Sequence, residues 1–399
     1  MSMFTKAYIP FRGYYSTPFS KWQMTLANSH SLELAASTAS RWFQGKGIDP
    51  TQFDYLYLGY TIHQKQAFYG APWVAGMIGA GDTPGCAVSQ ACSTSTTCLY
   101  NSAAGIEAGT FSNVINIMTD RMSNGPHAVW PNPPGPGGEV IHENWIMDNF
   151  ARDPHAGGAM VQTAENVARE VGLTKERCDQ TTARRYEQYA DALKDDRAFQ
   201  KRYMFPVEVP VSRKKTVTLE QDEGIIPTTL ESLAKLSPVS PGAVHSFGSQ
   251  THPADGNAAM VVTTADLARQ LSADPAVTIQ ICSYGQTRVA KGMMPKSLVP
   301  AAQMALDKAG VAVGDMKAIK THNPFIANDL YLCDQLGLDP LTINNYGSPL
   351  VFGHPQGPTV ARCVIELIEE LVGLGGGYGL FTGCAAGDTG AALVIKVDC

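Results

Sequence analysis

The sequence predicts an α/β protein built from two related halves, and three observations carry this prediction. The chain has 399 residues, of which 44% are apolar and only 17% charged, so it can bury a large core. Helix-like and strand-like runs alternate along it. A helix, a glycine turn and a short strand also occur in the same order in residues 31–60 and 297–323, where Gly47 matches Gly310.

The offset between these two segments extends to a second pair of helices. It aligns residues 96–109 with residues 359–372, and coincidence is a poor explanation for an offset kept across two helices and the strand between them. In the later helix, apolar residues at three- and four-residue spacing predict one buried face. The apolar runs 276–282 and 391–397 predict strands inside a mostly parallel sheet.

We expect three regions along the chain. Residues 1–123 form the N-terminal half, and a strand-like run within residues 241–270 returns to it. Residues 124–240 begin with a Pro/Gly-rich loop and continue with a polar run, which indicates an inserted covering loop domain. Residues 271–399 form the C-terminal half.

Composition excludes several classes of function. Lys and Arg number 30 against 36 Asp and Glu, so the net charge of -6 leaves no basic excess for a nucleic-acid partner. No apolar run approaches the roughly 18 residues of a membrane span, and we expect a cytoplasmic protein with no membrane association. The nine cysteines form no C-x-x-C pair, which predicts neither a disulfide framework nor a metal site.

One of these cysteines is a candidate nucleophile. The repeat places Cys92 and the turn at Gly353-His354-Pro355 in nearly equivalent loops, each before a helix. A thiol at a helix N-terminus beside an imidazole is more acidic than a free one. Packing as a small apolar side chain is the alternative for any single cysteine.

Five motifs occur in order along nearly the whole chain. They are AVSQACSTS (87–95), TAENVARE (163–170), DEGIIPTTLESLAKLSPV (222–239), GSPLVFGHPQGPTVAR (347–362) and CAAG (384–387). Together these motifs resemble the thiolase superfamily. The resemblance implies a duplicated α/β/α/β/α thiolase fold with two five-stranded sheets, an inserted covering loop domain, and acyltransferase chemistry of the Claisen type on coenzyme A thioesters.

This resemblance implies a catalytic role for four side chains. Cys92 would attack a 3-oxoacyl-CoA and become acylated, and His354 would activate it and then contribute to an oxyanion hole. Cys384 would be the acid and base for the enolate, and backbone N–H groups of Cys92 and Ala386 would form a second oxyanion hole. His322 stands where many thiolases have a water-binding asparagine, with a structural histidine as the alternative.

Departures from the family pattern bear on the substrate. Residues 244–256 replace the segment that usually lines the pantetheine channel. Together with Trp130 and Trp145, the replacements make the expected pocket rim aromatic, although ordinary packing is the alternative for each. The side chains assigned to substrate binding are Met160, Phe247, Thr251, Asn323, Tyr346 and Phe352.

These departures resemble one branch of the family, whose members work with a small OB-fold, zinc-ribbon partner subunit. Within it, the chain is similar to the subunit that cleaves benzoylsuccinyl-CoA to benzoyl-CoA and succinyl-CoA in aromatic degradation. The resemblance further implies a homodimer core, with acyl-CoA and CoA as substrates and no cofactor. Two alternatives stay open: a condensing enzyme of the ketosynthase or hydroxymethylglutaryl-CoA-synthase type, and a non-catalytic thiolase-like subunit of a complex.

Overall fold

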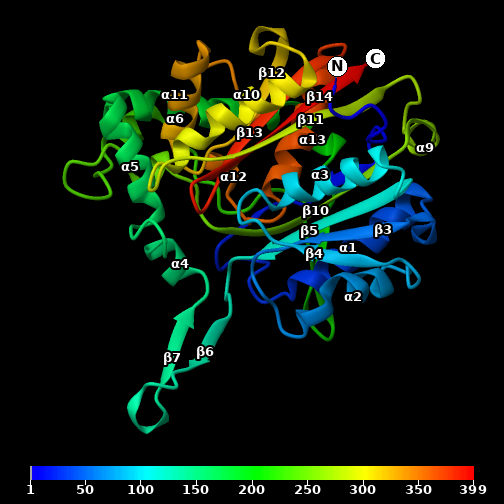
Figure 1. Cartoon of the computed structure of the whole chain (residues 1–399), viewed down its shortest axis with the longest axis horizontal. Helices are drawn as coiled ribbons and strands as arrows, with labels where there is room; N and C mark the ends of the chain where they lie inside the picture. The colour runs from blue at the N-terminus through cyan, green and yellow to red at the C-terminus, as the bar shows by residue number, and fades with distance from the viewer. Residues whose placement is uncertain (1) are drawn as a thin grey trace.

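A computed structural model describes residues 2–399 as two α/β units stacked on each other, with hairpins that project from the body (Figure 1). Helices α3 (Thr94–Glu107) and α13 (Thr359–Gly373) contact each other and both sheets, so they form the central layer. Helices α1 (Ser31–Lys46) and α2 (Gly70–Met77) cover the outer face of the first sheet, and α10 (Leu298–Ala309) covers the second. The expected α/β/α/β/α order is confirmed.

The first sheet has six strands and is mixed rather than mostly parallel. Strand β3 runs parallel to its neighbours β4 and β5, whereas β10 pairs antiparallel with β1, β2 and β5. The chain thus comes back to this sheet after the long insertion, although the region boundaries near residues 123, 240 and 270 stay a prediction. The strands are β1 (Tyr14–Ser16), β2 (Ser20–Lys21), β3 (Tyr55–Gly59), β4 (Gly85–Val88), β5 (Asn113–Arg121) and β10 (Ala254–Thr263).

Within residues 2–399 the second sheet has four strands in the order β11-β14-β13-β12, so the expectation of five is wrong. The segment beside β12 makes one backbone bond, from the Asn344 N–H to the Ile319 carbonyl at 2.9 Å, but Asn344 and Tyr346 have φ values of 63° and 65°, in the left-handed region that strands do not adopt. Instead, the Asn344 side chain accepts the N–H of Thr321 at 2.8 Å. The strands are β11 (Thr278–Arg288), β12 (Met316–His322), β13 (Gly377–Ala385) and β14 (Thr389–Asp398).

The sequence repeat corresponds to a repeated helix ending. Gly47 and Gly310 follow α1 and α10 with φ values of 66° and 72°, and the N–H of each bonds back to carbonyls of its helix. Glycine adopts this left-handed ending without steric cost. The chain then turns into β3 in one half and β12 in the other, so the two halves share a turn as well as an order of elements.

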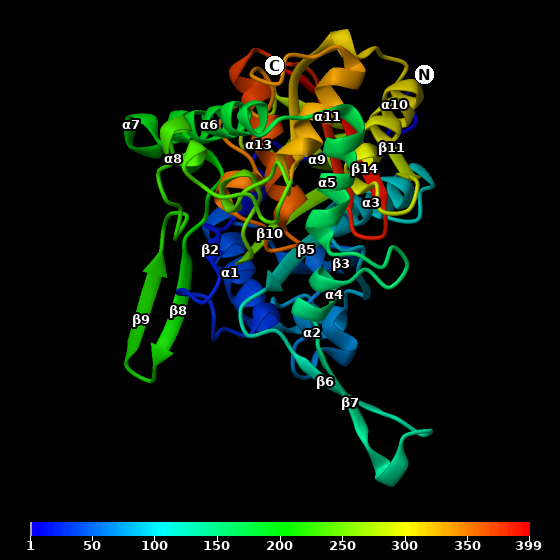
Figure 2. The same cartoon turned by 90° about the vertical axis from the view of Figure 1, so that its left-hand side faces the viewer.

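Residues between β5 and β10 carry the projecting parts of the molecule. Two hairpins extend away from the sheets (Figures 1 and 2). The elements here are β6 (His127–Pro131), β7 (Val140–Asn144), α4 (Met147–Ala151), α5 (Met160–Val171), α6 (Lys175–Ala192), α7 (Lys194–Arg197), β8 (Val207–Ser212), β9 (Lys215–Leu219) and α8 (Leu230–Ala234). The remaining helices are α9 (Ala265–Leu271), α11 (Ile326–Leu336) and α12 (Pro349–Phe352). Among residues 2–399, no helix combines the length and apolar character needed to cross a membrane.

Helix α13 differs from its expected one-sided burial. Every residue from Thr359 to Leu371 is buried, because the helix lies between two sheets. Its polar side chains must therefore find partners inside the protein. The guanidinium of Arg362 stacks over the ring of Phe352 at 3.8 Å and forms two hydrogen bonds with Asp222, at 2.6 and 2.8 Å.

This buried ionic network joins distant parts of the chain. Glu366 accepts from Arg362 at 3.0 Å, from Lys320 of β12 at 3.0 Å and from the Tyr203 hydroxyl at 2.6 Å. Because each charge has a partner of opposite sign, the cost of burying it is offset. The network fixes α13, which begins five residues after His354, against both β12 and the inserted region.

We expect Arg362→Ala to lower the free energy of unfolding by about 3–5 kcal/mol, because it leaves the carboxylates of Asp222 and Glu366 buried without their guanidinium partner. Chemical denaturation followed by circular dichroism measures this loss. The matched control is Arg269→Ala, which breaks an exposed pair with Asp266 and should cost at most about 1 kcal/mol. Equal losses in the two variants would contradict a stabilising role for the buried network.

Candidate active site

Four reactive side chains converge where the two halves meet. Cys92 lies in the loop between β4 and α3, and His354 follows α12. His322 ends β12 and Cys384 lies near the end of β13, where the parallel register pairs His322 with Gly383. A Cβ on Gly383 would come within 2.7 Å of the His322 Cβ, so glycine is needed for this close approach.

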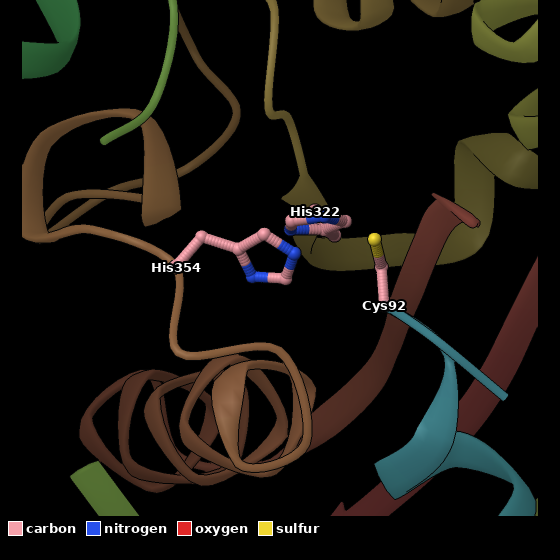
Figure 3. A group of neighbouring side chains, drawn as sticks. All are labelled: Cys92, His322 and His354. Atoms are coloured by element: carbon pink, nitrogen blue, oxygen red, sulfur yellow. The ribbon is translucent and has the colours of Figure 1, made fainter. Parts of the chain in front are cut away.

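The geometry of the cluster is compact. The Cys92 sulfur, one ring nitrogen of His322 and one ring nitrogen of His354 all lie within 4.8 Å of one another. The two imidazole centroids are 4.2 Å apart at an interplanar angle of 42°. Figure 3 shows the His354 ring reaching toward His322 and the Cys92 sulfur. The structure thus brings together the side chains predicted to be catalytic.

The loop before α3 holds the Cys92 thiol in place. Ala91 has φ of 44°, and the Thr94 hydroxyl donates to its carbonyl while accepting the N–H of Gln90 at 2.9 Å. The backbone N–H groups of Cys92 and Ala386 lie near the Cys92 sulfur, where they favour its thiolate. These two N–H groups are the pair predicted to form an oxyanion hole, and they come from different halves of the fold.

Burial dominates the electrostatics of the site. Desolvation raises the pKa of Cys92 to about 11, against the smaller effect of the two N–H groups that favour its thiolate. Desolvation also raises the pKa of Cys384 well above its ordinary value, and the nearby Cys92 adds to this. The same cause lowers the pKa of His354 to about 3 and that of His322 well below its usual range. At neutral pH the cluster therefore rests as two thiols and two neutral imidazoles.

A hydroxyl orients the catalytic imidazole candidate. Nδ1 of His354 is 2.7 Å from Oγ1 of Thr359, the first residue of α13, and the His354 N–H donates to the His252 carbonyl at 2.9 Å. This leaves Nε2, which has no hydrogen-bond partner within residues 2–399 and points toward the cluster (Figure 3). A neutral imidazole with an open ring nitrogen can accept a proton from a neighbouring thiol.

Asp120 joins the two halves behind the site. Its buried carboxylate accepts from the N–H groups of Thr61, Ile62 and Gly357, at 3.0, 2.8 and 2.8 Å. Gly357 lies three residues after His354, and its carbonyl also accepts from the Ser95 hydroxyl. Asp120 does not stand out in the sequence, because its role depends on contacts across the two halves.

The residues assigned to substrate binding are less uniform than the catalytic set. Asn323 is fully buried and uses its amide on Asp329, Ser348 and the N–H of Leu350. Thr251 donates its hydroxyl to the Pro349 carbonyl at 2.6 Å. These contacts make both residues part of the scaffold that carries β12 and α12.

The aromatic residues of this set do not share one wall. Phe352 is fully buried beneath the Arg362 guanidinium, and Tyr346 stacks on Phe199 with ring centroids 3.8 Å apart. Phe247 is 81% exposed, and Trp130 lies in the projecting β6–β7 hairpin. Met160 is half-buried at the start of α5, and Nε1 of Trp145 donates to the Thr61 carbonyl. The aromatic side chains expected to form one pocket rim are therefore dispersed over the molecule.

The same cluster contains atoms of the kind that bind metals. Thiolate and imidazole are ligands for zinc, which holds donors about 3.3–3.8 Å apart. One such atom from each of Cys92, His322 and His354 lies within 4.8 Å of the other two, and all three side chains are buried. A thiol beside an imidazole with an open ring nitrogen also suits proton transfer and nucleophilic attack.

Two family domains match this chain. The domain described as "Thiolase, N-terminal domain" matches residues 13–266, and "Thiolase, C-terminal domain" matches residues 275–397. Together they cover nearly all of the chain, so the protein belongs to the thiolase family. It is accordingly an acyltransferase, with coenzyme A as a co-substrate.

Individual relatives agree with this membership. The chain is 28% identical over 398 residues to the acetyl-CoA acetyltransferase of Pseudomonas aeruginosa, covering 96% of this chain and 97% of that protein. It is 27% identical over 387 residues to the mitochondrial 3-ketoacyl-CoA thiolase of Homo sapiens, covering 95% and 96%. The crystal structure of the human mitochondrial 3-ketoacyl-CoA thiolase in complex with CoA superimposes with a TM-score of 0.89 at 25% identity and covers 99% of both chains.

The buried, neutral cluster predicts how Cys92 reacts with pH in the free enzyme. Since the pKa of Cys92 is raised to about 11, its thiolate fraction should rise about tenfold per pH unit from pH 6 to pH 10. Alkylation of Cys92 by iodoacetamide, followed by peptide mass spectrometry, measures this. A rate that levels off near pH 7 would instead indicate a thiolate stabilised by an imidazolium and would contradict the neutral resting state.

Proposed function

We propose that the protein is a CoA-dependent thiolase that cleaves a 3-oxoacyl-CoA through an acyl-cysteine intermediate on Cys92. One observation carries this proposal: the Cys92 thiol and the imidazoles of His322 and His354 meet in a buried cluster from both halves, and the buried Cys384 follows Gly383, the register partner of His322. Cleavage of a C–C bond beside a thioester requires a soft nucleophile, a proton acceptor, an acid for the carbanion, and donors for an oxyanion. Each of these is present.

In the first half-reaction, Nε2 of His354 takes the Cys92 proton as the sulfur attacks the 3-oxo carbonyl. The new C–S bond places negative charge on the carbonyl oxygen, where the N–H groups of Cys92 and Ala386 stabilise it. The C–C bond then breaks, and the enolate of the shorter acyl-CoA takes a proton from the Cys384 thiol. His322, with its ring nitrogens unpartnered in the described part of the chain, faces this enolate with His354.

In the second half-reaction, the thiol of CoA attacks the acyl group on Cys92. The new thioester leaves and Cys92 is released. The proton of the CoA thiol replaces the one that Cys384 gave to the enolate, and the His354 imidazolium returns its proton to the released Cys92 sulfur. The protein thus returns to two thiols and two neutral imidazoles. No redox agent or metal takes part in this balance.

The second cysteine favours this proposal over a condensing enzyme, since ketosynthase-type enzymes generally lack it. Cys384 is fully buried, and it follows Gly383, which pairs with His322 in the register of β12 and β13. The complete set of groups also argues against a non-catalytic subunit.

For the acyl group we propose two candidates. The names of the relatives favour acetoacetyl-CoA and straight-chain 3-oxoacyl-CoAs. The altered residues 244–256 and the half-buried Met160 support a bulky or aromatic substrate such as benzoylsuccinyl-CoA, which would give benzoyl-CoA and succinyl-CoA. The dispersed aromatic rim weakens this second candidate, and a screen of both kinds of thioester with the purified enzyme decides between them.

We also propose a cytoplasmic homodimer formed through the edge of the first sheet. Strand β4 ends this sheet, and its Cys86 and Ala87 are exposed. An unpaired edge of this kind is a template for pairing with a second copy. A small OB-fold, zinc-ribbon partner subunit would sit beside the inserted region, where Val129 and Ile141 of the β6–β7 hairpin are exposed. Light scattering should give twice 42.7 kDa, and a monomer would contradict the dimer.

Two substitutions test the proposed function. Cys92→Ser should lower CoA-dependent cleavage at least about a thousandfold, because an alcohol replaces the soft nucleophile. Cys384→Ala should lower it by a similar factor while leaving transfer of an acyl group to Cys92 intact. The control is Cys86→Ser, which changes an exposed thiol on β4 and should keep full activity. Retained turnover in Cys92→Ser would reject the proposal.

A further inference from the structure

We infer that Asn328 is a positioning residue for Cys384: its side-chain amide holds the Cys384 sulfur and stabilises the thiolate that remains after the enolate is protonated. This inference rests on the proposed function. It assigns a role to a residue that lies outside all the motifs by which the family was identified in this sequence.

The contact is direct and shielded from water. Nδ2 of Asn328 donates to Sγ of Cys384 at 3.1 Å, and both side chains are fully buried. The orientation of the amide is set by its other end, since Oδ1 accepts the N–H of Phe325 at 3.3 Å. The Nδ2 group is therefore left to face the sulfur.

The first turn of α11 is itself held by the segment before β10, which Glu165 of the inserted region supports. The N–H of Ala327 donates to Nε2 of His245 at 3.4 Å, and Nδ1 of His245 lies 2.7 Å from the carboxylate of Glu165 on α5. The Thr251 N–H donates to the Pro324 carbonyl at 2.7 Å. Asn328 therefore approaches Cys384 from a turn that is fixed at several points, which favours a constant geometry.

The electrostatic surroundings of Cys384 make a donor necessary. Desolvation opposes its thiolate, and Cys92 and the Asp329 carboxylate oppose it further, whereas the bond from Asn328 favours it. His322 lies across the register on β12. The Asp329 carboxylate already accepts hydrogen bonds from the Arg185 guanidinium and the Thr321 hydroxyl. It therefore serves Cys384 neither as a donor nor as a base.

The proton balance shows where the bond matters. When the Cys384 S–H bond breaks and the α-carbon of the enolate gains the proton, a thiolate forms on a fully buried sulfur. The Asn328 N–H meets that charge. In the reverse direction the same thiolate removes an α-proton, so loss of the donor should slow proton exchange without affecting acylation of Cys92.

The test uses Asn328→Leu in the full-length enzyme, a variant of similar size without a donor. Exchange of the α-protons of acetyl-CoA for deuterium in D2O, read by mass spectrometry, should slow about tenfold to a hundredfold, and its rise with pH should move up by about one to two units. Acyl-adduct formation on Cys92 from the same acetyl-CoA should stay within about threefold of the wild type. The same two measurements, of α-proton exchange and of adduct formation, are repeated with succinyl-CoA as a second probe.

The control is Asn166→Leu, which removes an amide donor that bonds the Gly292 carbonyl from α5. It should leave exchange and its pH profile unchanged. Exchange at the wild-type rate in Asn328→Leu, or an equal fall in adduct formation, would overturn the inference and leave the thiolase proposal standing. A wild-type enzyme that neither exchanges nor acylates with any thioester of the substrate screen would reject the proposed function itself.

Discussion

The structure depends on the exclusion of charge and water from the place where its two halves meet. Cys92, His322, His354 and Cys384 are buried there, and desolvation holds all four in their neutral forms at rest. A site of this kind keeps its reactive groups unused until substrate arrives. In the proposed mechanism the negative charges then form on a carbonyl oxygen and on the Cys384 sulfur, each of which faces an N–H donor.

The charges that the fold does bury are kept in a separate network. Arg362 and Lys320 pair with Asp222 and Glu366 on the far side of α13, between the central helix and the inserted region. Asp120 serves the other side, where it ties the loop after His354 to the N-terminal half. The inserted region therefore does more than cover the site, since it contributes Asp222 to the core and supports the segment that holds the turn that carries Asn328.

Much of this arrangement can be read from the sequence. The repeated Gly47 and Gly310 predict the duplication, because a left-handed helix ending usually requires a glycine that can be recognised in the sequence. The Cys and Gly-His-Pro motifs predict the cluster of reactive side chains. The missing fifth strand could not be predicted, because it depends on the positive φ values of Asn344 and Tyr346. The full burial of α13 and the contact of Asn328 with Cys384 were missed because they arise from contacts between segments far apart in the chain.

The central claim is that Cys92 carries the acyl group between two half-reactions. Intact-mass measurement after rapid mixing with a 3-oxoacyl-CoA, in the absence of free CoA, tests it most directly. The account predicts one acyl adduct per chain on Cys92 and one equivalent of the shorter acyl-CoA released before CoA is added. Release of product without an adduct, or an adduct on a residue other than Cys92, would contradict it.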